Sequence, residues 1–280
     1  MLMQRVITAI VLLAVLMLAM SASSPWPFAG LMAVMCGCAG WEWARMTWPD
    51  HPSVRIGLGS ILFVLTLTIA NSLFSTKSPD GAWLRPLVVL SAIVWLTAVP
   101  TAVFRGKADA PARHLGWTLF APLALIVACA LMIFIFFRDG SLYLLSLLTL
   151  IWVADIFAYF GGKTLGKHKL AVRISPGKTI EGALVGLLGV IAWIAISSQW
   201  SGTYAADLLS RWGWSMTLLT AAVFAGVSIM GDLFESLLKR RAGIKDSSAL
   251  LPGHGGVLDR IDAVIAVLPL AFLMTAWPES

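Results

Sequence analysis

The chain has 280 residues, of which 59% are hydrophobic and 12% are charged. Soluble domains carry about 25% charged residues, so this composition excludes a soluble globular enzyme and a disordered chain. The cysteines Cys36, Cys38 and Cys129 lie in apolar runs and are too few for a disulfide framework or a four-ligand zinc site. The net charge of +6 does not indicate a nucleic-acid partner, because basic residues set the topology of membrane proteins. The sequence therefore predicts an all-α, polytopic integral membrane protein.

Nine apolar segments are candidates for membrane-spanning helices, since a bilayer core of about 30 Å needs about 20 apolar residues per helix. In chain order they run from Val6 to Met20, Pro27 to Met46, Ile56 to Phe74, Trp83 to Phe104, Leu115 to Phe137, Leu142 to Phe160, Ile180 to Trp200, Trp214 to Met230, and Ile261 to Trp277. The sixth and ninth are the least regular, because Asp155 interrupts one and Asp262 lies at the start of the other. We expect about nine transmembrane helices.

The positions of Lys and Arg predict the orientation of these segments, because basic residues are retained on the cytoplasmic side. With the N-terminus inside, most of the 20 basic residues, beginning with Arg5, fall in the inner segments. The exceptions are Lys77, Arg85, Arg138 and Arg211. The sequence thus predicts a cytoplasmic N-terminus and an external C-terminus.

The first apolar segment has an alternative interpretation as a cleaved signal peptide. Arg5, an apolar stretch and the small residues Ser21 to Ser24 follow one another in the order that such a peptide requires. Cleavage would leave the orientation of every later segment unchanged. We favour an uncleaved anchor, because no soluble domain follows.

The two halves of the chain differ in where they carry charge. Residues 1–140 form apolar segments with short loops, whereas residues 141–280 include two long, charged cytoplasmic loops. Half of the 14 acidic residues lie in or beside those two loops: Asp155, Glu181, Asp232, Glu235, Asp246, Asp259 and Asp262. We therefore expect an N-terminal transmembrane region over 1–140 and a catalytic transmembrane region over 141–280.

Asp155 is the first residue that points to chemistry. A charged carboxylate inside a membrane helix costs several kcal/mol and normally faces a partner or a wet cavity. One interpretation is that the helix span ends early and leaves Asp155 at the membrane interface. The other is that Asp155 faces a cavity and positions a cation or a lysine.

The stretch from Gly161 to Gly182 is rich in glycine and lysine. It is not a P-loop, because that motif requires a glycine where this chain has Val172. We expect the turn from Ser175 to Gly177 to open a helix, whose free N–H groups and dipole favour an anion. Lys178 would then add a positive charge and Thr179 a hydroxyl. The alternative is an ordinary helix cap beside lysines that set topology.

Two pairs of carboxylates flank the last charged loop. Asp232 and Glu235 are three residues apart, on one face near the C-terminal end of a helix. That end carries partial negative charge, so the pair requires a metal or a Lys or Arg partner. Asp259 and Asp262 have the same spacing at the start of the last helix, where acidic residues also serve as capping groups.

The loop between these pairs contains Gly253, Gly255 and Gly256, which allow close approach of the backbone to a ligand. His254 is ambiguous, since a lone histidine is more often structural than a ligand. The basic residues Lys239, Arg240, Arg241 and Lys245 would by default meet lipid headgroups. Their mixture with carboxylates and glycines favours a polyanion site, and hard oxygen ligands favour Mg²⁺ over zinc.

The run from Ser236 to Asp262 closely resembles the signature of phosphatidate cytidylyltransferases, also called CDP-diacylglycerol synthases. The matching residues are Ser236, Leu238, Lys239, Arg240, Lys245, Asp246, His254, Gly255, Gly256, Asp259, Arg260, Ile261 and Asp262. Asp155-x-x-Ala158-Tyr159, the run from Ile174 to Gly182 and the early Trp41-Glu42-Trp43 are similar to that family as well. One departure is Ile180, where the family pattern has tryptophan.

This resemblance implies a Mg²⁺-dependent reaction of CTP with phosphatidate at the cytoplasmic face, which gives CDP-diacylglycerol and pyrophosphate in phospholipid synthesis. It leaves open a second cation, suggests a homodimer among membrane lipids, and implies a bacterial-type inner membrane. The implied metal ligands are Asp232 and Asp246, with Asp259 and Asp155 less certain. The implied catalytic set is Asp232, Asp246, Lys239, Arg240, Lys245 and Asp259. The implied substrate-binding set is Ser175, Lys178, Thr179, His254, Gly255, Gly256 and Arg260.

Two rival functions are weaker. A CTP-dependent kinase of a polyprenol or phytol would need a base for its alcohol, and the full signature argues against it. A transporter would use Asp155, Glu181 and Asp232 as a cation path, but we find no paired repeats with broken helices. For the cytidylyltransferase, we expect Asp246→Asn to abolish turnover without changing expression.

Overall fold

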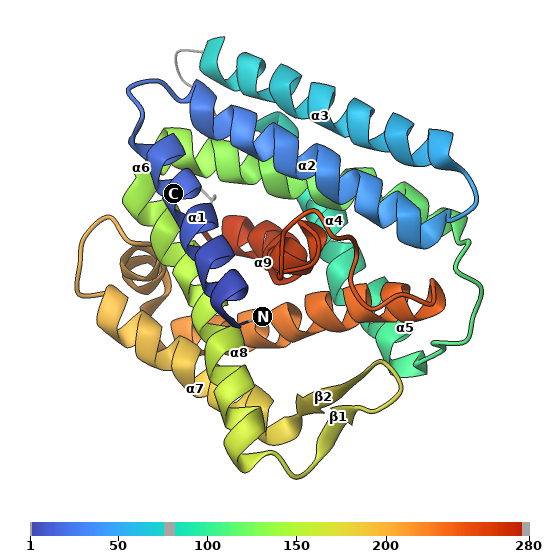
Figure 1. The fold of residues 1–280 in the computed structure, drawn as a ribbon. Coiled ribbons are helices and arrows are strands. Elements are labelled where there is room, and N and C mark those ends of the chain that lie inside the picture. The colour runs from blue at the N-terminus through green and yellow to red at the C-terminus, as the bar shows by residue number, and fades with distance from the viewer. Residues whose placement is uncertain (1, 76–81, 276–280) are drawn as a thin grey trace. The chain divides into compact units, whose positions relative to one another are not determined.

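The computed structural model describes residues 2–75 and 82–275 as a helical protein with one small hairpin (Figure 1). The predictions for Lys77, for the side chain of Arg5 and for a span end at Trp277 lie outside the described residues. The elements are α1 (Leu2–Ser21), α2 (Trp26–Thr47), α3 (Pro52–Ser75), a 3₁₀ turn (Ala82–Leu84), α4 (Arg85–Leu96), α5 (Ala98–Arg105), α6 (Leu115–Leu165), β1 (Lys169–Ala171), β2 (Ser175–Thr179), α7 (Ile180–Ser197), α8 (Tyr204–Arg241) and α9 (Leu258–Thr275).

Among the described residues, five helical segments are long and apolar enough to cross a membrane: Pro52–Ser75, Ala82–Arg105, Leu115–Leu165, Ile180–Ser197 and Tyr204–Arg241. The predicted helical, membrane-spanning class is confirmed, and the count of nine spans stays a prediction. The longest segment, α6, contains a break at Gly140, where φ is 86°. Glycine adopts such a φ readily, whereas other residues do not. The break lies between the fifth and sixth predicted spans.

The chain forms two compact units, each assembled from three stretches. The first contains residues up to Leu87, Asp109–Phe137 and Leu238–Ile261. The second contains Val88–Ala108, Arg138–Leu237 and the residues from Asp262 onward. Each unit therefore includes residues from both sides of the boundary at 140 that the charge distribution suggested.

In the first unit, α2 packs along α3 through glycines (Figure 1). A Cβ atom on Gly59 of α3 would lie 2.8 Å from the carbonyl oxygen of Gly37 in α2, and one on Gly37 would lie 3.0 Å from the carbonyl oxygen of Gly59. Small residues let the backbones of two membrane helices approach closely, which is how such helices gain packing energy. The contact fixes α2, which carries Glu42, against its neighbour.

In the second unit, α7 packs against the second part of α6 in the same way. Added Cβ atoms on Gly182 and Gly186 would lie 2.7 Å and 2.9 Å from the carbonyl oxygens of Ala158 and Ala154. The indole of Trp193 on α7 also donates a hydrogen bond of 3.0 Å to the carbonyl oxygen of Ser146. These contacts hold α7 against α6.

The start of α7 differs from the sequence prediction. The turn from Ser175 to Gly177 does not open a helix, because Ser175–Thr179 is strand β2 and pairs antiparallel with β1. The helix begins at Ile180, and the hydroxyl of the N-cap residue Thr179 accepts a hydrogen bond of 3.1 Å from the Gly182 N–H. Short strands carry little periodic signal, so the run of Ser, Pro and Gly at 175–177 indicates a helix start when the sequence is considered alone.

Candidate functional site

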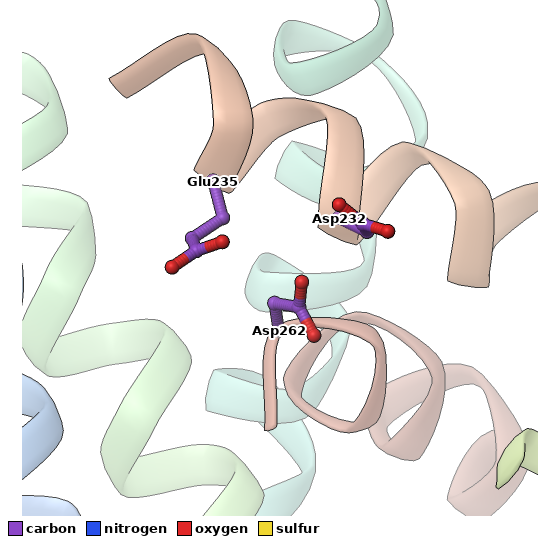
Figure 2. Close-up of side chains that lie close together, drawn as sticks. All are labelled: Asp232, Glu235 and Asp262. Carbon is purple, nitrogen blue, oxygen red and sulfur yellow. The ribbon is translucent and has the colours of Figure 1, made fainter. Parts of the chain in front are cut away.

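Three carboxylates converge in the second unit (Figure 2). Asp232 and Glu235 come from α8 and Asp262 comes from α9, and one oxygen of each lies within 4.8 Å of the others. Glu235 is 3% exposed and Asp262 is 9% exposed. Buried carboxylates that face one another repel strongly unless a cation compensates them. The cluster is therefore a candidate metal site.

Gly231 explains how α8 comes close enough to α9 to form this cluster. A Cβ atom there would collide with the carbonyl oxygen of Asp262 and lie 3.0 Å from the Cβ of Ala266. The glycine thus removes the side chain at the point where the two helices touch. Because of this close approach, the side chain of Asp232, the next residue along α8, lies near that of Asp262.

Lys178 of strand β2 supplies positive charge to the cluster. Its Nζ lies 2.5 Å from Oδ2 of Asp232, and both side chains are only partly exposed. Charge-assisted bonds of this kind are among the stronger polar contacts in proteins. The structure thus brings together two residues that the sequence assigned to different roles, Lys178 to phosphate and Asp232 to metal.

Asp155 on α6 also belongs to this neighbourhood. Asp155 interacts electrostatically with the Asp262 carboxylate, as Asp232 and Lys178 also do. The hydroxyl of Ser228 on α8 donates a hydrogen bond of 3.3 Å to Asp155 Oδ1. The helix α6 continues past this residue to Leu165. Asp155 therefore lies beside another polar group of the second unit, and its predicted role in positioning a cation or a lysine stays a prediction.

The donor set of the cluster fits Mg²⁺. Carboxylate oxygens are the hard ligands that this ion prefers, and it is usually held by one or two carboxylates together with substrate phosphates and water. Asp232, Glu235 and Asp262 meet this description, with Asp155 close by. The predicted ligand Asp246 is exposed in the first unit, and Asp259 lies in the same unit.

Asp259 is surrounded by donors from its own loop. Its Oδ2 accepts hydrogen bonds from the Ser247 N–H at 2.9 Å, the Ser247 hydroxyl at 2.8 Å and the Gly256 N–H at 2.8 Å. Its Oδ1 lies 2.5 Å from the Nζ of Lys239. In this ion pair the side chain of Asp259 is 6% exposed and that of Lys239 is 12% exposed. Asp259 therefore organises the loop, whatever else it binds.

The glycines of this loop adopt conformations that other residues avoid. Gly253 and Gly255 have φ of 74° and 83°, which glycine adopts without steric cost. The Leu251 N–H donates to the Gly255 carbonyl at 2.8 Å and closes the turn that contains His254. Arg260 donates from Nη2 to the His254 carbonyl at 2.9 Å. These bonds give the predicted His-Gly-Gly segment one defined shape.

The basic residues of the signature follow the end of α8. Gly243, with φ of 68°, stops the helix, and the Ile244 N–H donates to the Lys239 carbonyl at 3.0 Å, as in a Schellman motif. Arg240 and Lys245 are exposed. The phosphate contacts predicted for these two residues stay predictions.

The hairpin residues divide between two roles. Lys178 reaches the carboxylate cluster, whereas Thr179 is 4% exposed and caps α7. Ser175 lies at the start of β2 and is partly exposed. The phosphate contacts predicted for Ser175 and Thr179 stay predictions.

Sequence analysis missed three residues in part or in full. Glu235 and Asp262 were recognised by their spacing from Asp232 and Asp259, but they were not named as metal ligands. Glu42 was named only as part of the family resemblance, yet it is fully buried on α2 and four donor groups lie within hydrogen-bond distance of its carboxylate. The signal was available, because Glu42 is a carboxylate inside an apolar segment, as Asp155 is.

Comparisons with known proteins cover nearly the whole chain. The sequence profile of the Cytidylyltransferase family matches residues 3–277. The phosphatidate cytidylyltransferase of Pseudomonas aeruginosa is 36% identical over 280 residues, which is 99% of this chain and 97% of that protein. That of Haemophilus influenzae is 34% identical over 288 residues, with 96% of each chain covered. That of Thermotoga maritima is 41% identical over 141 residues, which is 49% of this chain and 51% of that protein.

Proposed function

The chain belongs to the cytidylyltransferase family, and we propose that it transfers CMP from CTP to phosphatidate, giving CDP-diacylglycerol and pyrophosphate. The observation that carries this proposal is the end-to-end similarity to relatives that bear the name phosphatidate cytidylyltransferase. The convergent carboxylates and the lysine beside them supply the kind of site that this chemistry needs.

The reaction joins two anions. An oxygen of the phosphatidate phosphate forms a bond to the α-phosphorus of CTP, while the bond from that phosphorus to the oxygen bridging to the β-phosphate breaks and pyrophosphate leaves. A phosphate monoester has a second pKa of about 6, so the nucleophile is largely ionised near neutral pH and needs no strong base. The main barrier is repulsion, which positioning and charge neutralisation must overcome.

Asp232, Glu235 and Asp262 would hold the Mg²⁺ that this family resemblance implies, with Asp155 as a neighbour. The bound ion would neutralise charge on the phosphates of CTP. Three facing carboxylates on two helices support this assignment over Asp246, which is exposed on a loop. Asp246 and Asp259 remain ligands implied by the resemblance, and a second cation remains part of the proposal.

The basic residues would bind the phosphates. Lys178 lies against a carboxylate of the proposed metal site, and this position supports a role in contacting a phosphate that binds there. Lys239 is held by Asp259, and Arg260 is held by the His254 carbonyl. Further substrate contacts are proposed on the family resemblance alone: Ser175, Thr179, Arg240, Lys245 and the segment from His254 to Gly256.

The protein is a multi-pass membrane protein. We place the site at the cytoplasmic face of a bacterial-type inner membrane, because the basic residues collect in the segments predicted to face inside. A homodimer among membrane lipids is part of the proposal on the family resemblance alone.

A direct assay tests the function. The purified full chain in detergent, with labelled CTP, Mg²⁺ and phosphatidate, should form a CDP-lipid and release pyrophosphate in equal amounts. Formation of CDP together with a phosphorylated alcohol would show the kinase reaction instead. Absence of turnover by protein that melts cooperatively would also contradict the proposal.

A further inference from the structure

The carboxylate of Glu42 holds the loop that joins α8 to α9. Its Oε1 accepts hydrogen bonds from the Ser248 hydroxyl at 2.5 Å and the Val257 N–H at 3.0 Å. Its Oε2 accepts from the Ser247 hydroxyl at 3.1 Å and the Leu258 N–H at 2.6 Å. Glu42 is 0% exposed, and a buried carboxylate is strongly unfavourable unless it is hydrogen-bonded in this way. The loop therefore supplies the donors that allow Glu42 to be buried.

Two of these donors belong to the N-terminus of α9. The helix begins at Leu258, and the N–H groups at a helix start have no partner within the helix and carry partial positive charge. Glu42, on α2, satisfies the N–H groups of Val257 and Leu258 from more than 200 positions away in the sequence. It therefore caps α9 and fixes where that helix begins.

Two further features of the first unit tie the loop to α2. Arg45, one helical turn after Glu42, donates from Nη1 to the Ser247 carbonyl at 2.9 Å. A Cβ atom on Gly256 would collide with the Ser247 hydroxyl and with Oε1 of Glu42. Glycine is thus required at position 256 because of the space that the carboxylate occupies.

The same loop connects Glu42 to Asp259. The Ser247 hydroxyl lies 3.1 Å from Oε2 of Glu42 and 2.8 Å from Oδ2 of Asp259. A hydroxyl has one hydrogen to donate, so Ser247 bridges two carboxylates that compete for it. Asp259 in turn holds Lys239 at 2.5 Å. A shift of the loop away from Glu42 would therefore displace both Asp259 and Lys239.

We propose that Glu42 is a positioning residue of the transferase, which fixes the Ser247–Leu258 loop and thereby orients Asp259 and Lys239 toward the substrates. The inference rests on the proposed substrate and metal roles of those two residues. The inference gives a role to the Trp41-Glu42-Trp43 segment, which is far from the signature in sequence. In this role Glu42 fixes the conformation of the signature loop.

The first test is Glu42→Gln, which keeps the size of the side chain but replaces an acceptor oxygen with an N–H₂ group facing N–H and O–H donors. We expect kcat to fall about 10- to 100-fold, the usual cost of removing a group that orients a ligand-bearing residue. The KM values for CTP and phosphatidate should change much less than kcat. Cys36→Ala is the matched control, because Cys36 is equally buried on α2 and lies outside this network.

The second readout is hydrogen–deuterium exchange of the full chain in detergent. In Glu42→Gln the amides of Gly256, Val257 and Leu258 should exchange faster, whereas Cys36→Ala should leave them unchanged. This measurement needs no turnover. If the wild-type protein made no CDP-lipid, the proposed function would fail, and the exchange rates would still report whether Glu42 holds the loop.

Full turnover by Glu42→Gln would overturn the proposal, as would loop exchange equal to that of the wild type. A loss of kcat that Cys36→Ala reproduces would assign Glu42 a general packing role and overturn it too. If Glu42→Gln does not fold, Ser248→Ala replaces it, since this change removes one donor and leaves the carboxylate charged. It should lower kcat by a smaller factor and speed loop exchange, and Glu42→Asp should retain more activity than Glu42→Gln; the opposite results count against the proposal.

Discussion

Two groups of carboxylates, one in each compact unit, have different surroundings. In the first unit, Glu42 and Asp259 are surrounded by backbone N–H groups, hydroxyls and a lysine, which together use both oxygens of each carboxylate. In the second unit, Asp232, Glu235 and Asp262 face one another, with one oxygen of each within 4.8 Å of the others, and Lys178 pairs with Asp232. A carboxylate whose oxygens all accept hydrogen bonds stabilises the segments that donate them. Facing carboxylates repel one another, and additional positive charge stabilises them. The same residue type thus serves two purposes in one chain.

The largest effect is expected for Asp262→Asn. Loss of a carboxylate from the cluster should lower turnover by more than about 100-fold, because metal neutralisation of the substrate phosphates is worth several kcal/mol. The measurement is CDP-lipid formation at saturating Mg²⁺.

The matched control is Asp207→Asn, which changes a carboxylate on α8 that pairs with Arg211 at 2.7 Å and with the Tyr143 hydroxyl at 2.9 Å. This variant should keep most of its activity. Equal losses in the two variants would mean that the cluster has no special role and would remove the contrast between the units.

A smaller effect is expected for Lys178→Gln. The residue lies against Asp232 and is proposed to contact phosphate, and a charge-assisted hydrogen bond contributes about 1.5–3 kcal/mol. The KM for CTP should therefore rise about 10-fold, where each 1.4 kcal/mol corresponds to a factor of ten. Lys169→Gln, an exposed position in the same hairpin, should leave the KM nearly unchanged. A similar rise in both variants would indicate a diffuse attraction to charge instead of a defined contact.

The approach of α8 to α9 predicts a difference between two glycines on α8. Gly231→Ala should lower the free energy of unfolding by about 1–3 kcal/mol, as overpacking does, and should reduce turnover because it separates Asp232 from Asp262. Gly226→Ala should be neutral or stabilising, since a Cβ atom there meets nothing within 4 Å. Thermal unfolding of the two variants in the same detergent distinguishes them. Equal melting temperatures would contradict the role assigned to Gly231.

The sequence predicted the helical membrane class, and the family resemblance found in the Ser236 to Asp262 signature is confirmed by the comparisons. Long apolar segments give a strong signal, because each must satisfy its backbone polar groups within a helix. The pairing of Asp232 with Glu235 could also be predicted, because residues three apart lie on one face of a helix.

What the sequence did not predict depends on contacts between distant segments. The convergence of Asp262 with Asp232 requires the close approach at Gly231, and the burial of Glu42 requires donors more than 200 residues away. The strand at Ser175–Thr179 depends on pairing with Lys169–Ala171, and it was mistaken for a helix start. Local patterns identify the residue types of a site, and tertiary contacts decide how each one is used.

The proposed divalent cation site of Asp232, Glu235 and Asp262 can be tested directly. Mn²⁺, used as a substitute for Mg²⁺, can be titrated into the purified full chain in the presence of CTP, with bound ion measured by electron paramagnetic resonance. We expect a tight Mn²⁺ site in the wild type and in Asp207→Asn, and a site at least about 10-fold weaker in Asp262→Asn. Unchanged Mn²⁺ affinity in folded Asp262→Asn would contradict the proposed site.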